Sequence, residues 1–281
     1  MVIGVDLGGT KVRAGVAVNG QVRNQKQELF RSRGSQTETL GQLIDLLRSL
    51  MTPDIEGIGV GVPSVIDVER GIVYNVVNIP SWDCVPLKDI LEKEFTVPVS
   101  VNNDVNCFAL GEHRFGLLKG LRNAVGVTIG TGLGSGIIIN NALYNGTNCG
   151  AGELGLLNYM DHNIEYYTSG NFFEAMHEVS AIVAHDLAVS GDQKALGWWK
   201  EFGSHVGQAM KTVVYCYDPE AIVIGGSVSK AFRFFEEAMF RSLKDFTFPE
   251  SIKRFKILQS VDENITLLGA AALINSERSP L

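Results

Sequence analysis

Three short glycine-rich turns follow apolar segments at separate places in the chain, and backbone N–H groups in such turns bind anions. They span residues 6–11, 130–136 and 225–227. Glycine permits the tight dihedral angles and the close approach that aim N–H groups at phosphate oxygens. A single such turn also suits an ordinary hairpin, but three at corresponding positions predict a nucleotide site. The predicted phosphate contacts are glycine, threonine and lysine residues of these turns: Gly8, Gly9, Thr10, Lys11, Gly130, Thr131, Gly132, Gly225 and Gly226.

Asp6 lies at the end of the first apolar segment, directly before the first turn. A carboxylate close to phosphates is explained by Mg²⁺, which keeps several waters and binds through one or two carboxylates. We therefore predict that Asp6 holds Mg²⁺ through water. The chain has neither GxxxxGK[ST] nor a GxGxxG that opens a helix in a βαβ unit, which argues against P-loop and dinucleotide-binding folds.

A polar loop, Asn102-Asn103-Asp104, connects an apolar strand to a predicted helix. One interpretation is an Asx turn in which Asp104 caps the helix. The other is a general base, because a sugar hydroxyl is a poor nucleophile and phosphoryl transfer gains from a carboxylate that accepts its proton. We favour the second interpretation and predict Asp104 as the base.

Two further carboxylates stand in settings that suit a polyol substrate. Glu153 lies among the small residues of 150–155, and Glu174 opens an amphipathic run. Each also has a plain structural interpretation, namely solvent exposure for Glu153 and a favourable charge at a helix N-terminus for Glu174. Carboxylates paired with Asn amides hold sugar hydroxyls, so we predict a sugar site that contains Asn78, Asn103, Glu153 and Glu174.

The elements that must position these residues form two similar halves. Residues 2–18 predict a β-hairpin, which residues 125–139 repeat, and residues 220–227 echo the strand and turn of residues 56–63. Helical periodicity covers residues 37–51, 86–95, 106–115, 171–190, 192–216 and 265–275, and further strands are predicted at 55–62 and 97–101. We predict an α/β protein with one lobe at 1–115, joined by a C-terminal helix at 264–281, a second lobe at 116–263, and a cleft between the lobes.

The composition predicts a globular protein with neither a nucleic-acid nor a membrane partner. The chain has 281 residues, of which 45% are hydrophobic, enough for two lobes with their own cores. The net charge of −7 is opposite in sign to the positive charge with which proteins bind nucleic acid. No segment fits a signal peptide or approaches the ~20 apolar residues of a membrane helix. The cysteines form no CxxC, and we expect reduced, buried thiols in a cytoplasmic protein: Cys84, Cys107, Cys149 and Cys216.

Together these motifs resemble the ROK family of sugar kinases over nearly the whole chain. The matching segments are residues 6–11, 61–63, 78–82, 103–106, 130–132, 152–155 and 225–226. The resemblance implies an actin-like (ribonuclease H-like) two-lobed ATPase fold with an internally duplicated strand-hairpin core, ATP and Mg²⁺ as cofactors, and a homodimer. It places the base on Asp104 and the sugar contacts on Asn103, Glu153 and Glu174. Ser64, which stands where many relatives have glycine, is added to the predicted substrate site.

Two departures concern a structural zinc ion that the family carries. The family motif GExGH ends in a His that touches sugar and zinc, and this chain has Leu156 there. The motif CxCGxxGCxE is replaced by residues 165–174, in which only the last Glu remains. Zinc needs about four N or S ligands, so we predict no structural zinc site. We hypothesise that an aromatic cluster positions Glu174 in place of the metal: Tyr166, Tyr167, Phe172 and Phe173.

The predicted function is ATP-dependent phosphorylation of a hexose, with glucose at O6 favoured over N-acetylglucosamine, N-acetylmannosamine and other hexoses. Three other classes are weighed against it. A repressor of the same family would need a DNA-binding segment before the first strand, and the chain is acidic. A catalytically silent sugar sensor would lack the base that Asp104 supplies. An actin-like or chaperone-like ATPase acting on proteins would not need Glu153 and Glu174.

Overall fold

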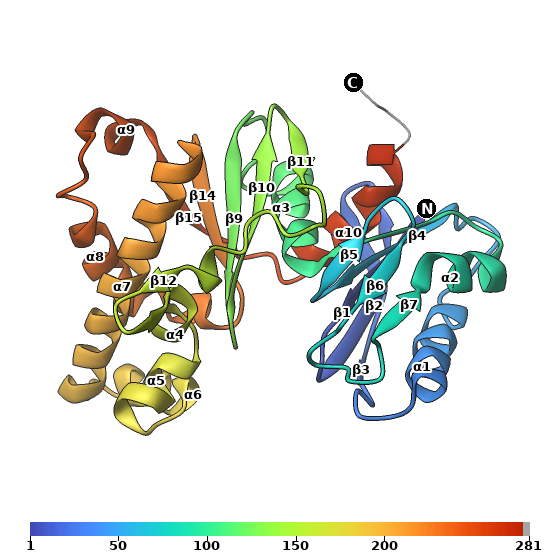
Figure 1. Cartoon of the computed structure of the whole chain (residues 1–281), viewed down its shortest axis with the longest axis horizontal. Helices are drawn as coiled ribbons and strands as arrows, with labels where there is room; N and C mark the ends of the chain where they lie inside the picture. Colours follow the sequence, from blue (N-terminus) through green and yellow to red (C-terminus); the bar gives the residue numbers. More distant parts are fainter. Residues whose placement is uncertain (278–281) are drawn as a thin grey trace. The chain divides into compact units, whose positions relative to one another are not determined.

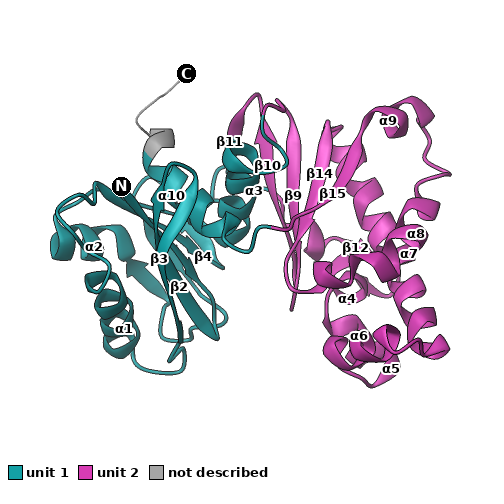
Figure 2. Ribbon diagram, turned by 180° about the vertical axis from the view of Figure 1, so that it is seen from behind, with its two compact units in different colours: residues 1–119, 143–151, 262–281 teal, residues 120–142, 152–261 magenta. Residues whose placement is uncertain are grey.

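The computed structural model describes residues 1–277, and the chain divides into two compact units (Figure 2). Unit 1 contains Met1–Lys119, Leu143–Ala151 and the C-terminal segment that starts at Asp262, and unit 2 contains Gly120–Ala142 and Gly152–Val261. The sequence predicted that the second lobe spans residues 116–263 without interruption. It did not predict that Leu143–Ala151 belongs to unit 1. Of the closing helix predicted at 264–281, residues 278–281 lie outside the described residues.

Unit 1 is built on a five-stranded sheet in the order β3-β2-β1-β4-β8 (Figure 1). Its strands are β1 (Val2–Leu7), β2 (Lys11–Val18), β3 (Gln21–Leu29), β4 (Gly57–Val62) and β8 (Val99–Asn103). The first three form an antiparallel meander, whereas β4 and β8 run parallel to β1. Because parallel strands end at the same edge of a sheet, the ends of β1, β4 and β8 bring Asp6, Val62 and Asn103 to one edge.

Helices cover this sheet and hold its strands in place. They are α1 (Gln36–Arg48), α2 (Leu87–Phe95), α3 (Asp104–Phe115) and α10 (Ile265–Glu277). The backbone of helix α10 packs directly against the backbones of β1 and β4, because a Cβ at Gly4 or Gly59 would overlap the main chain of α10. A smaller antiparallel sheet in the same unit consists of β5 (Val65–Asp67), β6 (Ile72–Tyr74) and β7 (Cys84–Pro86).

Unit 2 repeats the central part of the first sheet. Its five-stranded sheet has the order β11-β10-β9-β14-β15, with strands β9 (Ala124–Ile129), β10 (Leu133–Ile139), β11 (Ala142–Tyr144), β14 (Ala221–Gly225) and β15 (Lys256–Gln259). The hairpin β9-β10 is antiparallel and β14 runs parallel to β9, as β4 does to β1. The chain passes from unit 2 to unit 1 within β11 (Ala142–Tyr144). The internal duplication predicted from the echoed segments is therefore present in the strand order.

The remaining elements of unit 2 include its long helix α7, on which several of the others pack. They are a short 3-10 helix (Leu154–Leu156), β12 (Asn158–Tyr159), β13 (His162–Asn163), α4 (Ile164–Thr168), α5 (Asn171–His177), α6 (Ala181–Val189), α7 (Gln193–Tyr217), a second 3-10 helix (Val228–Ala231), α8 (Phe232–Ser242) and α9 (Pro249–Arg254). The single helix predicted at 171–190 is wrong. Glu178 has a φ of +59° and ends α5, and Ser180 caps α6 by accepting a hydrogen bond from Val183 N.

Each unit has its own apolar core. In unit 1 the largest buried side chain is Trp82, whose Nε1 donates to Thr39 Oγ1 over 2.8 Å. In unit 2 a cluster of rings around Trp199 and Phe202 fills the space between α7 and the elements packed on it. No helix among residues 1–277 combines the length and apolar character needed to cross a bilayer.

The cysteine prediction needs a correction. All four thiols are free, and Cys107 and Cys149 are buried, but Cys84 and Cys216 are exposed. Apolar neighbours in the sequence did not imply burial, because Cys84 lies on a three-residue strand and Cys216 lies on the outer face of the last turn of α7.

Candidate active site

The polar loop at the end of β8 forms the start of α3. Asn103, rather than Asp104, caps the helix: its Oδ1 accepts hydrogen bonds from Val105 N (2.8 Å) and Asn106 N (3.4 Å). The interpretation in which Asp104 is the cap is therefore wrong. Asp104 is the first helical residue and is partly buried. Its carboxylate therefore lies at the N-terminal end of α3, where the helix dipole makes a negative charge favourable.

A buried network of amides supports this loop from behind. Asn106 Nδ2 donates to Asn102 Oδ1 (2.9 Å) and Asn145 Oδ1 (3.3 Å), and Asn102 Nδ2 also donates to Asn145 Oδ1 (3.1 Å). Cys149 Sγ donates to Asn102 Oδ1 over 3.2 Å. Asn145 and Cys149 belong to Leu143–Ala151, and their hydrogen bonds connect this segment to β8 and α3 of unit 1. Sequence reasoning missed the network, because Asn145 is 39 residues from Asn106.

The first glycine turn lies at the same edge of the unit 1 sheet. Gly8 N donates to Lys11 O over 2.9 Å, which closes the turn, and the side chains of Thr10 and Lys11 are exposed. A Cβ at Gly9 would overlap the Asn78 side chain, so the predicted sugar residue Asn78 lies against the predicted phosphate turn.

Ser64 and Asp6 are also placed in unit 1. The Ser64 hydroxyl donates to Tyr74 O, and its backbone oxygen accepts a hydrogen bond from Asn103 Nδ2 over 3.4 Å. The structure therefore brings Ser64 and Asn103 together through the backbone of Ser64. Asp6 is ion-paired with Arg13, a residue that sequence reasoning did not single out.

The second and third glycine turns adjoin each other in unit 2. Gly226 has a φ of +88°, and a Cβ there would overlap the backbone of Ile129, the residue before Gly130. Gly130 O accepts a hydrogen bond from Gly170 N over 2.7 Å, and Thr131 O accepts one from Asn171 Nδ2 over 3.1 Å. The turns at 130–132 and 225–226 thus lie side by side, at the carboxyl ends of β9 and β14.

The carboxylate that lies beside Glu153 is Glu165, which sequence reasoning missed. Glu165 Oε2 accepts a hydrogen bond from Leu133 N over 2.9 Å, and a Cβ at Gly132 would overlap its carboxylate. Partial desolvation raises the pKa of Glu153, and the negative charge of Glu165 raises this pKa further. Glu174 has an exposed side chain on α5. Gly170 N, just after α4, donates to Gly130 O and ties the end of α4 to the second glycine turn, a long-range contact that no local sequence pattern signals.

The predicted aromatic cluster exists and includes two histidines that were not predicted. Tyr166 contacts Tyr167 and Phe172 contacts Phe173, with ring centroids 5.0 and 5.2 Å apart. His205 on α7 joins the two pairs, 5.0 Å from Tyr167 and 5.7 Å from Phe172. His162 stacks on Tyr166 at 3.9 Å.

His205 anchors this cluster through a hydrogen bond of 3.0 Å between its Nδ1 and the Tyr159 hydroxyl. Burial lowers the pKa of His205, so its ring is neutral near pH 7. No group of three or more His, Cys, Asp or Glu suited to a metal occurs among the described residues. The aromatic rings pack α4, and with it Glu165, against α7.

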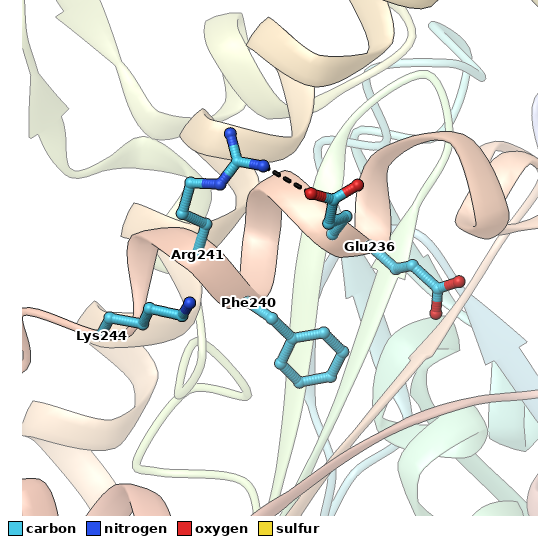
Figure 3. A pocket seen from close by; sticks show the side chains of 5 residues that line it. Glu236, Phe240, Arg241 and Lys244 are labelled. Atoms are coloured by element: carbon cyan, nitrogen blue, oxygen red, sulfur yellow. Dashed lines mark hydrogen bonds and ion pairs between the residues drawn. The ribbon is translucent and has the colours of Figure 1, made fainter.

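A surface pocket on α8 contains none of the predicted site residues (Figure 3). Its lining residues are charged or apolar side chains of α8 and of the turn that follows it: Glu236, Glu237, Phe240, Arg241 and Lys244. Arg241 is ion-paired with Glu237 four residues earlier, as expected on an exposed helical face. The pocket therefore plays no part in the candidate site.

Comparison with known proteins identifies the family. A sequence model of the ROK family matches residues 2–277. This chain belongs to the ROK family. A glucokinase of Thermotoga maritima is 26% identical to this ROK protein, over 97% of this chain and 96% of its own length. The xylose repressor of Bacillus subtilis is 26% identical over 83% of this chain and 66% of its own length.

The fold of this ROK protein is the actin-like ATPase fold. The crystal structure of a ROK family glucokinase from Streptomyces griseus in complex with glucose and AMPPNP matches it with a TM-score of 0.81 and 27% identity. The match covers 97% of this chain and 98% of the Streptomyces chain. The fold class predicted from the sequence is thus confirmed.

Proposed function

We propose that this ROK protein is an ATP-dependent hexose kinase that phosphorylates glucose at O6 with Asp104 as general base. The observation that carries the proposal is the common edge of the unit 1 sheet, where Asp6 lies near the end of β1, the turn at residues 6–11 leads into β2, and Asp104 follows β8. The similarity to glucokinases along almost the whole chain supports the sugar kinase class over the repressor class.

In this proposal Asp104 accepts the proton of the attacking hydroxyl. The carboxylate lies at the N-terminal end of α3, and the cap by Asn103 fixes the backbone that carries it. Asn103 Nδ2 donates a hydrogen bond to the backbone oxygen of Ser64, which holds the Asn103 amide in place. The buried network of Asn102, Asn106 and Asn145 keeps the end of β8 in one conformation.

The sugar contacts predicted in unit 2 are carboxylates. We assign this role to Glu153 and Glu165, because a Cβ at Gly155, two residues after Glu153, would lie 3.3 Å from the Cβ of Glu165, and the charge of Glu165 raises the pKa of Glu153. Two neighbouring carboxylates provide several acceptor lone pairs for hydroxyl groups. Glu174 remains the alternative predicted from the sequence.

The phosphates of ATP contact the backbone N–H groups of the glycine turns, together with Thr10, Lys11 and Thr131. Asp6 fits Mg²⁺, since Mg²⁺ in nucleotide sites binds through one or two carboxylates and completes its shell with phosphates and water. When bound, Mg²⁺ neutralises charge on the transferred phosphoryl group.

A second candidate substrate is an N-acetylated hexosamine. Leu156, in the 3-10 helix that follows Glu153, has 62% of its surface exposed. An exposed leucine beside a sugar-binding carboxylate favours a substrate with an apolar group such as an acetyl methyl. We therefore include both substrate classes in the test.

The function is tested by ADP formation with Mg²⁺ and ATP, using glucose, mannose, fructose, N-acetylglucosamine and N-acetylmannosamine. We expect turnover of at least one sugar, and no loss of it with a zinc-selective chelator. Binding of a sugar by calorimetry without any turnover would instead identify a silent sensor. In Asp104→Asn we expect kcat to fall about 10²-fold or more, with sugar and ATP still bound, because the base alone is lost. Normal turnover by that variant would refute Asp104 as the base.

A further inference from the structure

Asp6 is held by an arginine on the neighbouring strand. Arg13 lies on β2 directly opposite Asp6 in the antiparallel pair. Its Nε and Nη2 donate to Asp6 Oδ2 over 3.1 and 2.6 Å. Its Nη1 donates to the backbone oxygen of Glu263 over 2.9 Å, just before α10 begins. The guanidinium is therefore fixed on both sides, by β1 and by the segment that leads into α10.

The environment of this pair differs from that of an ordinary surface ion pair. Only 21% of the Arg13 side chain and 23% of the Asp6 side chain are exposed. Arg48, which pairs with Asp45 and Glu94 in the same unit, is 58% exposed. Charge-assisted bonds from a rigid guanidinium fix a carboxylate best where water is partly excluded. The Arg13–Asp6 pair therefore sets the orientation of Asp6, and Arg48 provides a matched control.

The geometry at the carboxylate is asymmetric. Both Arg13 N–H groups that reach Asp6 converge on Oδ2, and neither is directed at Oδ1. A carboxylate that is held through one oxygen presents the other in a defined direction, which is how outer partners orient ligands in metal sites. We propose that Arg13 is a positioning residue of the magnesium site and holds Asp6 through Oδ2 so that Oδ1 receives a metal-bound water. This inference rests on the proposed function, which assigns Mg²⁺ to Asp6.

Removal of Arg13 has two opposite effects on a divalent cation at Asp6. The guanidinium charge repels the cation, so electrostatics alone predicts tighter metal binding without it. Loss of an orienting partner typically weakens metal affinity by about 10- to 100-fold. The sign of the change therefore distinguishes a positioning residue from a mere counter-ion.

The test measures ADP binding by isothermal titration calorimetry, with Mg²⁺ and with EDTA, for the full-length chain and its variants. The quantity of interest is the factor by which Mg²⁺ tightens ADP binding. We expect Arg13→Gln to reduce this factor about tenfold or more, and Arg48→Gln to leave it unchanged. Asp6→Asn should lose the factor as well, and adding Arg13→Gln to Asp6→Asn should cause no further loss.

Two results would overturn the inference. One is an unchanged or larger magnesium factor in Arg13→Gln, which would make Arg13 a counter-ion only. The other is an equal loss of ADP affinity with Mg²⁺ and with EDTA, which would make Arg13 a direct phosphate ligand.

A second variant keeps the test valid if Arg13→Gln does not fold. Arg13→Lys keeps the charge but cannot reach both Asp6 and the Glu263 oxygen as a guanidinium does. Positioning predicts that Arg13→Lys also loses part of the magnesium factor, and a factor equal to that of the wild type would contradict it. Failure of the proposed function appears separately, as the absence of sugar-dependent ADP formation by the wild-type chain.

Discussion

The choice between Glu165 and Glu174 as the second sugar-binding carboxylate can be decided with one pair of variants. Glu165→Gln keeps an oxygen that can accept the hydrogen bond from Leu133 N, so the turn before β10 should stay intact. The variant loses the negative charge, and with it the stronger hydrogen bonds that carboxylate oxygens would accept from sugar hydroxyls. Glu174→Gln makes the same chemical change on the exposed side of α5.

The expected magnitude follows from the kind of hydrogen bond that is lost. Hydrogen bonds to charged groups contribute about 1.5–3 kcal/mol and neutral ones about 0.5–1.5 kcal/mol. Replacing one by the other costs about 1–1.5 kcal/mol, which corresponds to an increase of about five- to tenfold in the KM for sugar. For Glu174→Gln we expect a change in KM of less than about twofold, because surface substitutions have small effects.

The assay is coupled ADP formation over a range of sugar concentrations at saturating Mg²⁺ and ATP, with sugar binding measured by calorimetry on the same samples. Urea unfolding of both variants provides the control for folding. A KM that rises in Glu174→Gln and not in Glu165→Gln would refute the assignment made from the structure. It would also restore the interpretation based on motif spacing.

Three further predictions concern unit 2. The pKa of Glu153 is raised, so as the pH falls its carboxylate is protonated before an ordinary glutamate, whose pKa is about 4.3. Because protonation removes the charge that binds sugar hydroxyls, the KM for sugar should rise as the pH falls toward the pKa of Glu153. A KM that stays flat down to the ordinary range would contradict a role for Glu153 in sugar binding. Gly226→Ala should lower the free energy of unfolding in urea by about 2 kcal/mol or more, because φ is +88° there and a Cβ would meet backbone. Gly197→Ala, where a Cβ meets nothing within 4 Å, should not destabilise the chain. Tyr159→Phe should cost about 1 kcal/mol in the same experiment, since the hydrogen bond to His205 is lost and the ring contacts remain.

Much of the fold follows from local signals in the sequence. The hairpins at β1-β2 and β9-β10 were predictable because a tight glycine turn between two apolar runs specifies both strands. The start of α1 was predictable as well, since Ser35 and Glu38 form a capping box within four residues. The break between α5 and α6 was not, because Glu178 adopts a positive φ that its residue type does not signal.

The sequence by itself determined which groups are candidates for the chemistry and near which strand ends they lie. In unit 1, Asp6, Asp104 and the turn at residues 6–11 stand near points where an apolar strand stops, and parallel strands bring these points to one edge of the sheet. These inferences need only the period of the apolar pattern and the properties of glycine and carboxylates, which do not depend on distant residues.

The tertiary structure alone decided which side chains meet across long stretches of the chain. Glu165 reaches Leu133, 32 residues away, only because Ser169-Gly170 and the rings packed on His205 hold α4 in place. Arg13 is fixed from outside its hairpin by the Glu263 oxygen, 250 residues later in the chain. Such pairings depend on how helices and strands pack, and packing sums many weak contacts that no short motif records.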